Sequence, residues 1–295
     1  MSIVVDSHQH FWDPALADYP WMTDAVAPIR RRYMPADLRP RLAAAGVDYT
    51  LVVQARSDVR ETRELLRLAA DTDFIAGVVG WVDLTSPNLA DTIDQLRELE
   101  GGAKLVGIRH QVHDESDERW LLGDDVLRGL RIVQDAGLAY DLLVRTRELP
   151  AALRVAQTLD SLRFIIDHIA KPPIRTGETI EWAEALAPFA GLTNVFCKIS
   201  GMVTEADWKD WRTEDLKPYV ERVYEWFGEG RCLFGSDWPV CLLAASYQQV
   251  LDACRAALGP LPPRARARVF GENAISVYRL PVSSPREGAP CSPTA

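Results

Sequence analysis

Short apolar runs alternate with longer amphipathic segments along almost the whole chain. Eight of these runs predict β-strands, because a continuous apolar stretch of this length is typical of a strand that is buried on both faces. The predicted strands are Ile3–Asp6, Tyr49–Gln54, Ile75–Trp81, Lys104–Arg109, Ala139–Val144, Arg163–Asp167, Asn194–Ile199 and Arg231–Gly235.

The segments between the runs predict helices. The clearest places apolar residues at i, i+3, i+4, i+7, i+8 and i+11 from Leu216 to Phe227, which is one stripe of an α-helix. A shorter stripe runs from Leu89 to Leu99, and a third starts at Val126 and stops before Gly137, a residue suited to a helix C-terminus. Eight strand–helix alternations predict a closed barrel or a doubly wound open sheet.

Two observations favour the barrel and define its limits. The sequence has no Gly-x-Gly-x-x-Gly and no Walker-type loop, so the usual reason to prefer a nucleotide-binding open sheet is missing. The predicted fold class is therefore α/β, a single-domain (β/α)8 TIM barrel over residues 1–280. After Leu280 the composition changes to Pro, Ser, Gly and Thr, which predicts a disordered C-terminal tail over residues 281–295.

Composition excludes several classes of partner. The 295 residues carry a net charge of −9, which disfavours general binding to nucleic acid or anionic lipid. The N-terminus lacks the pattern of a signal peptide, and no apolar run approaches the roughly 18 residues of a membrane span. The five cysteines include no Cys-x-x-Cys pair, which fits a reduced, cytoplasmic protein.

Four residues with catalytic potential lie at predicted strand ends. His8 and His10 follow the first strand, and the alternation of side chains in extended backbone points both to one side. His168 ends the sixth strand, and Asp237 follows the eighth. A lone His-x-His is more often structural, His168 alone could be a core histidine, and Asp237 alone could be a helix N-cap. Together, at the barrel end that carries catalytic groups, they predict an active site.

These residues belong to longer motifs that resemble the amidohydrolase superfamily, and within it the branch of sugar-lactone hydrolases. The matching segments, in the expected order, are Asp6–Pro14, Gly107–His110, Asp167–Pro172, Cys197–Gly201 and Phe234–Pro239. The resemblance covers the chain to about Leu280. It implies a hydrolase of carbohydrate catabolism that opens a lactone, such as an L-fucono- or L-rhamnono-lactone, to the aldonic acid.

The resemblance also implies a metal centre, with one departure. Superfamily members with two metals carry a bridging lysine at the end of strand 4, where this chain has Arg109 and His110. It therefore implies at most one divalent ion, which we expect to be zinc, and some relatives in this branch work without metal. The expected ligands are His8, His10, His168 and Asp237.

Two of these residues are also expected to be catalytic. Asp237 would take a proton from water and return it to the ring oxygen, and His168 would stabilise the developing oxyanion. Six residues are expected to contact the substrate: Arg109, His110, Trp12, Lys171, Lys198 and Trp238. Arg109 and the two lysines could instead form structural ion pairs. His113 is expected to be a surface residue, and the stretch from Phe11 to Pro35 to cover the pocket.

Two other functions remain open at this point. Related single-metal barrels are decarboxylases of aromatic or unsaturated acids, and Arg109 could bind the carboxylate that such a reaction removes. A non-catalytic sugar-acid-binding protein is the third hypothesis, although it gives little reason to retain all four site residues. The expected partner is a small lactone, and a homodimer is a further possibility because exposed barrel helices commonly pair.

Overall fold

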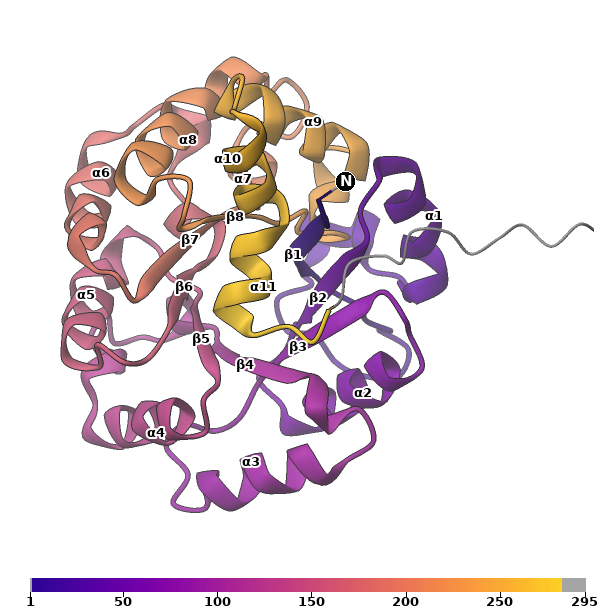
Figure 1. Ribbon diagram of the computed structural model, residues 1–295, viewed down its shortest axis with the longest axis vertical. Coiled ribbons are helices and arrows are strands. Elements are labelled where there is room, and N and C mark those ends of the chain that lie inside the picture. Colours follow the sequence, from indigo (N-terminus) through magenta and orange to yellow (C-terminus); the bar gives the residue numbers. More distant parts are fainter. Residues whose placement is uncertain (1, 283–295) are drawn as a thin grey trace, which may run out of the picture.

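The computed structural model describes residues 2–282, and its centre is a ring of eight parallel strands (Figure 1). The strands are β1 (Val5–Gln9), β2 (Tyr49–Val53), β3 (Ile75–Gly80), β4 (Leu105–His110), β5 (Ala139–Leu142), β6 (Phe164–Ile166), β7 (Val195–Ile199) and β8 (Cys232–Phe234). Each strand pairs with the next, and a parallel bridge between Gln9 and Trp238 brings β8 back to β1. The predicted single-domain (β/α)8 TIM barrel is confirmed.

The apolar runs located every strand, and the largest difference in boundaries concerns β1. This strand begins at Val5 rather than Ile3 and continues to Gln9. Asp6 pairs with Thr50 and Gln9 with Val52, so β1 carries one extra residue between these two pairs. The apolar pattern missed this end of the strand because its residues are polar, although every residue of β1 is buried.

Most helices lie outside the ring, as Figure 1 shows. The helices of the described residues are α1 (Pro35–Ala45), α2 (Val59–Ala70), α3 (Leu89–Glu98), α4 (Asp124–Asp135), α5 (Leu149–Thr158), α6 (Ile180–Leu186), α7 (Met202–Glu205), α8 (Thr213–Phe227), α9 (Tyr247–Leu258), α10 (Pro263–Ala267) and α11 (Asn273–Tyr278). The three stripes in the sequence correspond to α3, α4 and α8. The apolar faces of these helices pack against the strands in one continuous core.

A second apolar cluster fills the barrel at the amino ends of the strands. Helix α11 lies across this end, in yellow in front of the strands in Figure 1. Its residues Ala274, Val277 and Tyr278 pack against inward-facing strand residues that include Val5 and Leu51. The amino end of the barrel is therefore closed by apolar contacts, and the carboxyl end is left to hold the polar residues.

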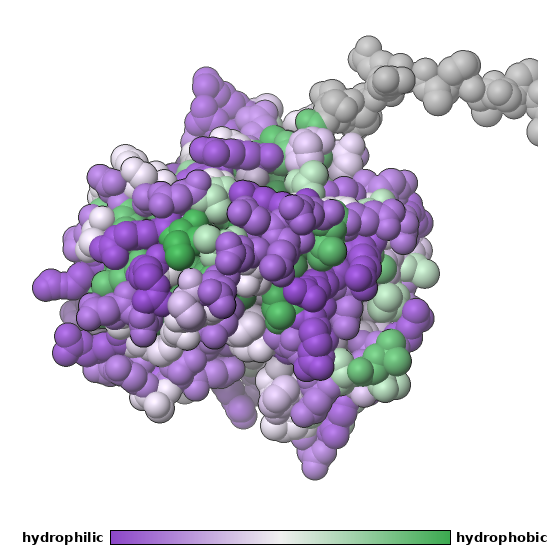
Figure 2. Space-filling model, turned by 90° about the horizontal axis from the view of Figure 1, so that it is seen from below, coloured by the Kyte–Doolittle hydropathy of each residue, from purple (hydrophilic) through white to green (hydrophobic). Residues whose placement is uncertain are grey.

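The surface is largely polar. Figure 2 shows one face that is mostly hydrophilic, with apolar side chains in small separate groups. Within residues 2–282, no helix has the length and apolar character needed to cross a membrane. Residues 283–295, which make up most of the predicted tail, lie outside the described residues.

Candidate active site

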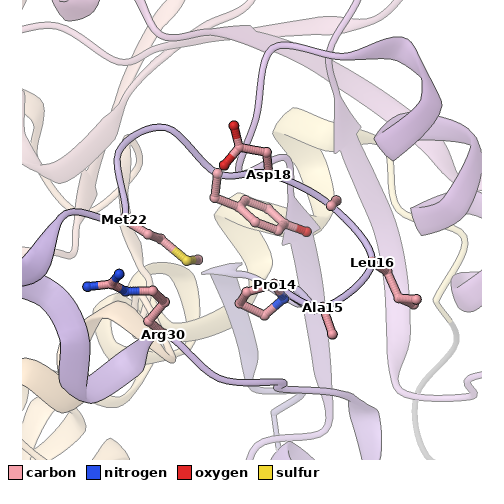
Figure 3. Close-up of a pocket in the computed structure, with 8 residues that line it drawn as sticks. Pro14, Ala15, Leu16, Asp18, Met22 and Arg30 are labelled. Carbon is pink, nitrogen blue, oxygen red and sulfur yellow. The ribbon is translucent and has the colours of Figure 1, made fainter.

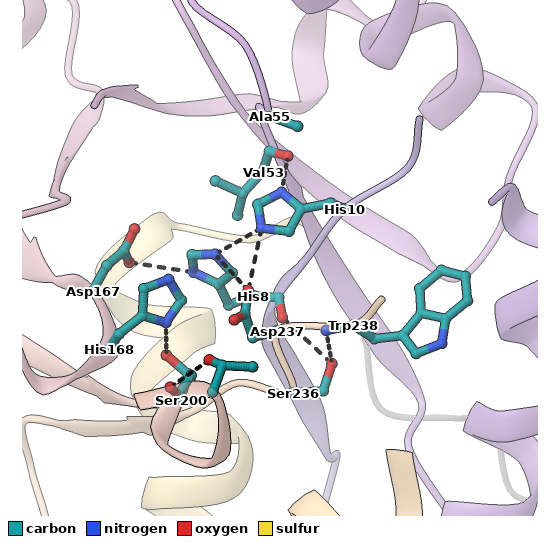
Figure 4. Close-up of polar contacts among 12 residues, drawn as sticks. His8, His10, Val53, Ala55, Asp167, His168, Ser200, Ser236, Asp237 and Trp238 are labelled. Atoms are coloured by element: carbon teal, nitrogen blue, oxygen red, sulfur yellow. Dashed lines mark hydrogen bonds and ion pairs between the residues drawn. The ribbon is translucent and has the colours of Figure 1, made fainter. Parts of the chain in front are cut away.

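Three histidines and one aspartate meet at the carboxyl ends of three strands (Figure 4). His8 lies in β1 and His10 follows it, while His168 and Asp237 follow β6 and β8. The Nε2 atoms of His8 and His10 are 3.2 Å apart, and Asp237 Oδ1 lies 3.8 Å from the first and 3.4 Å from the second. The ring centroids of His8 and His168 are 4.4 Å apart. The fold thus brings the four residues into one buried cluster.

The orientation of His10 follows from one backbone contact. Its Nδ1 lies 2.7 Å from the carbonyl oxygen of Val53. Because a carbonyl only accepts hydrogen bonds, Nδ1 carries a proton there, and a neutral His10 then has an unshared electron pair at Nε2. That Nε2 faces His8 and Asp237.

His168 stands in a left-handed turn. Residues 168–171 all have φ between 47° and 61°, and none is glycine. Each non-glycine residue in this conformation costs about 1–2 kcal/mol, so the surrounding fold must hold the turn in place. Part of that support is a hydrogen bond of 2.7 Å from Trp182 Nε1 to the carbonyl oxygen of Ile169.

The loop after β7 fixes the His168 ring. Its Nδ1 lies 2.9 Å from the hydroxyl oxygen of Ser200. The next residue, Gly201, has a φ of +61°, and a Cβ atom there would lie 2.4 Å from His168 Nδ1. Glycine is therefore required at position 201, both for its backbone and for the space the imidazole occupies.

Asp237 is held by contacts between β1 and the loop after β8. Its backbone N–H donates to the carbonyl oxygen of His8 over 2.8 Å, and it too has a positive φ, of 56°. Asp6 Oδ1 accepts hydrogen bonds from the backbone N–H groups of His8 and Ser236, and Oδ2 accepts one from the Tyr247 hydroxyl. The buried Asp6 side chain thus joins the two segments that carry the site.

Burial determines the charge state of the cluster. It lowers the pKa of His8 and of His168 well below the usual value, so both rings are neutral at neutral pH. Burial alone would raise the pKa of Asp237, but neighbouring groups that carry or can carry positive charge, namely His168, His10 and Lys171, hold that pKa below its usual value. Asp237 is therefore a carboxylate among imidazoles.

The donor atoms of the cluster fit a single metal ion. His8, His168 and Asp237 each offer one ligand atom, and these atoms lie within 4.8 Å of one another. Two nitrogens bound tetrahedrally to one zinc ion would be about 3.3 Å apart, close to the 3.2 Å between the Nε2 atoms of His8 and His10. Imidazole and carboxylate are ligands that zinc accepts. These residues could hold one divalent ion.

A network of buried ions lies beneath the imidazoles. Arg109 Nη1 donates to Asp167 Oδ2 over 2.9 Å and lies 3.2 Å from His8 Nε2. Lys198 Nζ lies 2.5 Å from Asp141 Oδ2 and 3.0 Å from Asp167 Oδ1. Two cations and two carboxylates therefore balance, as buried charges require.

A pocket of about 150 Å³ opens above the cluster. His10, His168 and Asp237 line it, together with two of the predicted substrate contacts, Arg109 and Lys171. Its remaining lining residues are Trp21, Ala55, Gln111, His113, Asp114, Leu143 and Val240. His113, expected at the surface, thus belongs to the pocket. Trp21 lies in the stretch that we expected to cover the pocket.

The other four expected substrate contacts do not line this pocket. Trp238 is fully buried against Tyr33, and the 2% exposed Trp12 packs on the same tyrosine. Lys198 is fully buried in the ionic network.

His110 has both ring nitrogens occupied. Its Nδ1 accepts from Trp81 Nε1 over 2.9 Å, and its Nε2 lies 2.8 Å from Glu115 Oε1. Its ring stacks on Trp120 with 4.3 Å between centroids. The motif signal found His110 because it follows Arg109, but the alternation of side chains turns it away from the pocket.

Another cavity, of about 440 Å³, is formed by the segment that connects β1 to α1 (Figure 3). It is lined by Pro14, Ala15, Leu16, Ala17, Asp18, Tyr19, Met22 and Arg30. Arg30 is already paired with Asp24, at 2.7 Å, and the cavity contains none of the four cluster residues. Although this cavity is larger than the pocket above the cluster, we therefore assign it no role in the chemistry.

Comparison with known proteins gives a consistent result. A family model described as amidohydrolase matches residues 5–280. The chain is 40% identical over 288 residues to an L-fucono-1,5-lactonase of Burkholderia multivorans (strain ATCC 17616 / 249), covering 94% of this chain and 96% of that protein. It is 42% identical over 288 residues to an L-fucono-1,5-lactonase of Burkholderia ambifaria, covering 95% and 97%.

A solved structure shares the fold closely. A crystal structure of an amidohydrolase from Burkholderia multivorans with bound zinc superposes with a TM-score of 0.89 at 38% sequence identity. The match covers 95% of this chain and all of the other. That relative is thus a zinc-containing protein of the same architecture.

Proposed function

Since the chain belongs to the amidohydrolase family, we propose that it is a hydrolase that opens a small sugar lactone to its aldonic acid. The observation that carries this proposal is the identity of 40% and 42%, over nearly the whole chain, to two L-fucono-1,5-lactonases. We propose L-fucono-1,5-lactone or a close stereochemical relative as the substrate. The enzyme is then a carboxylic ester hydrolase.

Asp237 is the proposed catalytic base and acid. Its depressed pKa keeps it ionised at neutral pH, so it can accept a proton from water as that water attacks the lactone carbonyl. When the ring C–O bond breaks, the same carboxyl returns the proton to the ring oxygen. The reaction consumes one water and releases one hydroxy acid, with no covalent intermediate on the protein.

Three neighbouring side chains would stabilise charge on the carbonyl oxygen. Arg109 and Lys171 bring positive charge to the pocket, and His168 offers a ring nitrogen from its fixed turn. Donors that stand ready where charge develops are usually the largest contribution to such catalysis. Lys171 is held in place by Glu205, with 2.7 Å between Nζ and Oε1.

The metal in our proposal is one zinc ion, with His8, His168 and Asp237 as ligands and His10 as a fourth. When bound, such an ion supplies Lewis acidity toward water and the lactone carbonyl. The fit of the donor atoms supports this, and the charge of Arg109, 3.2 Å from His8 Nε2, opposes it. Without the ion, Arg109 and Lys171 would remain in the pocket as cationic donors, so we expect removal of the metal to lower the rate rather than abolish it.

Recognition of the sugar would depend on the outer part of the pocket. Trp21 offers an indole face to the apolar side of a sugar ring, and its Nε1 is fixed by a 2.8 Å hydrogen bond to the carbonyl oxygen of Ala55. Gln111 and Asp114 offer amide and carboxylate groups to hydroxyls. These residues replace Trp12 and Trp238 in our proposal.

We also propose a cytoplasmic protein of carbohydrate catabolism, with no nucleic-acid or membrane partner and with a homodimer as a prediction to test. The net charge of −9 supports the absence of nucleic-acid partners. Cys197, Cys232, Cys241 and Cys254 are free and buried, which supports a reducing compartment.

A lactone panel tests the proposed function. Acid release from sugar 1,4- and 1,5-lactones would be followed with a pH indicator, with and without chelator, against the spontaneous rate. We expect the fastest opening with a 6-deoxyhexono-1,5-lactone, and a loss of rate with chelator that zinc restores. No rate above the spontaneous one, with folded and zinc-supplied protein, would refute the lactonase. Release of CO2 from an aromatic acid would favour the decarboxylase instead.

A further inference from the structure

A chain of polar contacts connects the apolar end of the barrel to the candidate active site. Tyr278, the last residue of α11, is 2% exposed, and its hydroxyl donates to Asp141 Oδ1 over 2.7 Å. Asp141 Oδ2 lies 2.5 Å from Lys198 Nζ, which in turn lies 3.2 Å from His8 Nδ1. Tyr278, Asp141 and Lys198 do not line the substrate pocket, and the proposed reaction uses none of them.

The ring of His8 has competing partners on both sides. Its Nδ1 faces Lys198 Nζ at 3.2 Å and Asp167 Oδ1 at 3.3 Å. Its Nε2 faces Arg109 Nη1 and His10 Nε2, both at 3.2 Å. Lysine and arginine only donate hydrogen bonds, whereas a carboxylate only accepts them. A neutral imidazole has one ring proton, so two arrangements compete.

In the first arrangement the proton is on Nδ1 and points to Asp167. Nε2 is then unprotonated, and its single electron pair accepts from Arg109 Nη1. In the second arrangement Lys198 donates to Nδ1, and the proton on Nε2 points toward His10. The position of the Lys198 ammonium decides between the two.

Asp141 draws that ammonium away from His8. The distance from Lys198 Nζ to Asp141 Oδ2 is 0.7 Å shorter than the distance to His8 Nδ1, 2.5 Å against 3.2 Å. Asp141 is itself fixed by the Tyr278 hydroxyl, which occupies its other oxygen. All three side chains are buried, so water does not compete for these contacts.

We propose that Tyr278, Asp141 and Lys198 form a positioning relay that keeps His8 protonated at Nδ1 and unprotonated at Nε2. The relay acts through His8 and touches no substrate. Its consequence for turnover rests on the proposed lactonase function, but its effect on His8 does not. Outer partners of this kind typically change activity or metal affinity by about 10–100-fold when they are mutated.

Nitrogen NMR of the ring atoms tests the relay directly. The full chain would be labelled with ¹⁵N-histidine and freed of metal by chelator. The sequence has only five histidines, and the His8 signals would be assigned by their loss in His8→Gln. We expect a protonated Nδ1 and an unprotonated Nε2 in the wild type. A wild-type His8 that is protonated at Nε2 would overturn the proposal.

Variants separate the relay from a structural role. In Asp141→Asn the ammonium loses the nearer of its two carboxylates and keeps Asp167 at 3.0 Å, so it should move toward His8 and favour the Nε2-protonated form. Adding Lys198→Met to that variant removes the competing donor and should restore the Nδ1-protonated form. An unchanged His8 in Asp141→Asn, or no restoration in the double variant, would contradict the relay.

A milder pair of variants covers the case in which Asp141→Asn does not fold. Tyr278→Phe leaves both charges in place and should move the His8 signals part of the way to the second form. Tyr140→Phe is the matched control, because its buried hydroxyl has no hydrogen-bond partner among the described residues. Equal signals in Tyr278→Phe and the wild type would overturn the proposal.

Kinetics then measure the consequence of the relay. We expect Asp141→Asn to lower kcat by about 10–100-fold with KM within about twofold, because the substrate pocket is unchanged. The wild-type activity on its own tests the proposed function. If the His8 signals follow the variants and no lactone is opened, the relay stands and the lactonase fails.

Discussion

The two ends of the barrel are built on the same eight strands and carry opposite kinds of side chain. At the amino end, Val5, Leu51 and Ile165 pack with α11 in an apolar cluster. At the carboxyl end, buried side chains are charged or able to carry charge. They include His8, Arg109, Asp141, Asp167 and Lys198.

The carboxyl end also holds the costly features of the fold. The left-handed turn over residues 168–171 and the positive φ of Asp237 both lie there. Arg109 Nε and Trp238 Nε1 are buried there without a hydrogen-bond partner within residues 2–282. Such departures concentrate where function requires them, and the apolar end offsets their cost. Stability and chemistry are therefore separable, and mutations at each end should affect different properties.

The largest effect on stability should come from the amino end. Leu51 is fully buried in the apolar cluster, so Leu51→Ala leaves a cavity and should cost about 2–5 kcal/mol of unfolding free energy. Chemical denaturation would measure this. The lactonase kcat/KM per folded molecule should stay within about twofold, and a tenfold loss would contradict the separation of the two ends.

The reverse pattern is expected for Gly201→Ala. The new Cβ would meet His168 Nδ1 and displace the ring, and a displacement of about 1 Å at a catalytic group can cost about 10²-fold in rate. Steady-state kinetics would measure the loss in kcat/KM. The left-handed backbone adds about 1–2 kcal/mol of destabilisation, which Gly46→Ala, also in the left-handed conformation and with open space around the new Cβ, controls for.

A buried acid at the carboxyl end, Glu61, should make the free energy of unfolding depend on pH. Burial raises the pKa of Glu61 from 4.5 to about 7, although its carboxylate accepts from the backbone N–H groups of Ala55 and Arg56. Because the folded-state pKa is the higher one, the stability contribution of protonated Glu61 is full below pH 4.5. It is lost as the pH rises to about 7, by up to about 3 kcal/mol.

Glu61→Gln removes this titration and keeps an oxygen for the two backbone donors. We expect its free energy of unfolding, relative to wild type, to be higher at pH 8 than at pH 4.5 by about 1–3 kcal/mol. Denaturant titrations at the two pH values would measure the difference. The exposed Glu64→Gln is the control, and an equal difference for both variants would contradict the assignment.

The smallest effect should be a gain at the amino end. Arg279 follows α11, is exposed and has a φ of 54°, a conformation that glycine adopts without strain. Arg279→Gly should therefore stabilise the fold by about 1 kcal/mol without changing kcat. Thermal unfolding would show it, and a lowered melting temperature would contradict this interpretation of the helix end.

The sequence predicted the barrel well because its main signal is local. An apolar run bounded by polar residues marks a buried strand, and strand order follows from the right-handed crossovers of such folds. Position at a strand end was then enough to group His8, His10, His168 and Asp237. The carboxyl ends of the strands lie close together in a barrel, so no further sequence signal was needed to predict that these residues meet.

Depth within the barrel could not be predicted in the same way. Lys198 lies within β7 and does not line the pocket. Only the three-dimensional packing shows that it contacts Asp141 and Asp167. Trp238 directly follows Asp237, but its side chain points in another direction. Asp237 lines the pocket, whereas Trp238 is buried in the core. Tyr278 is far from every motif in the sequence, so its contact with Asp141 had no sequence signal.

The lactone-opening rate of Asp237→Asn tests the central claim most directly. Initial rates on L-fucono-1,5-lactone would be compared with wild type at equal concentrations of folded protein, after subtraction of the spontaneous rate. We expect a fall in kcat of at least about 10²-fold. An active wild type together with a variant that retains more than a tenth of its rate would contradict the assignment of Asp237 as the group that moves the proton.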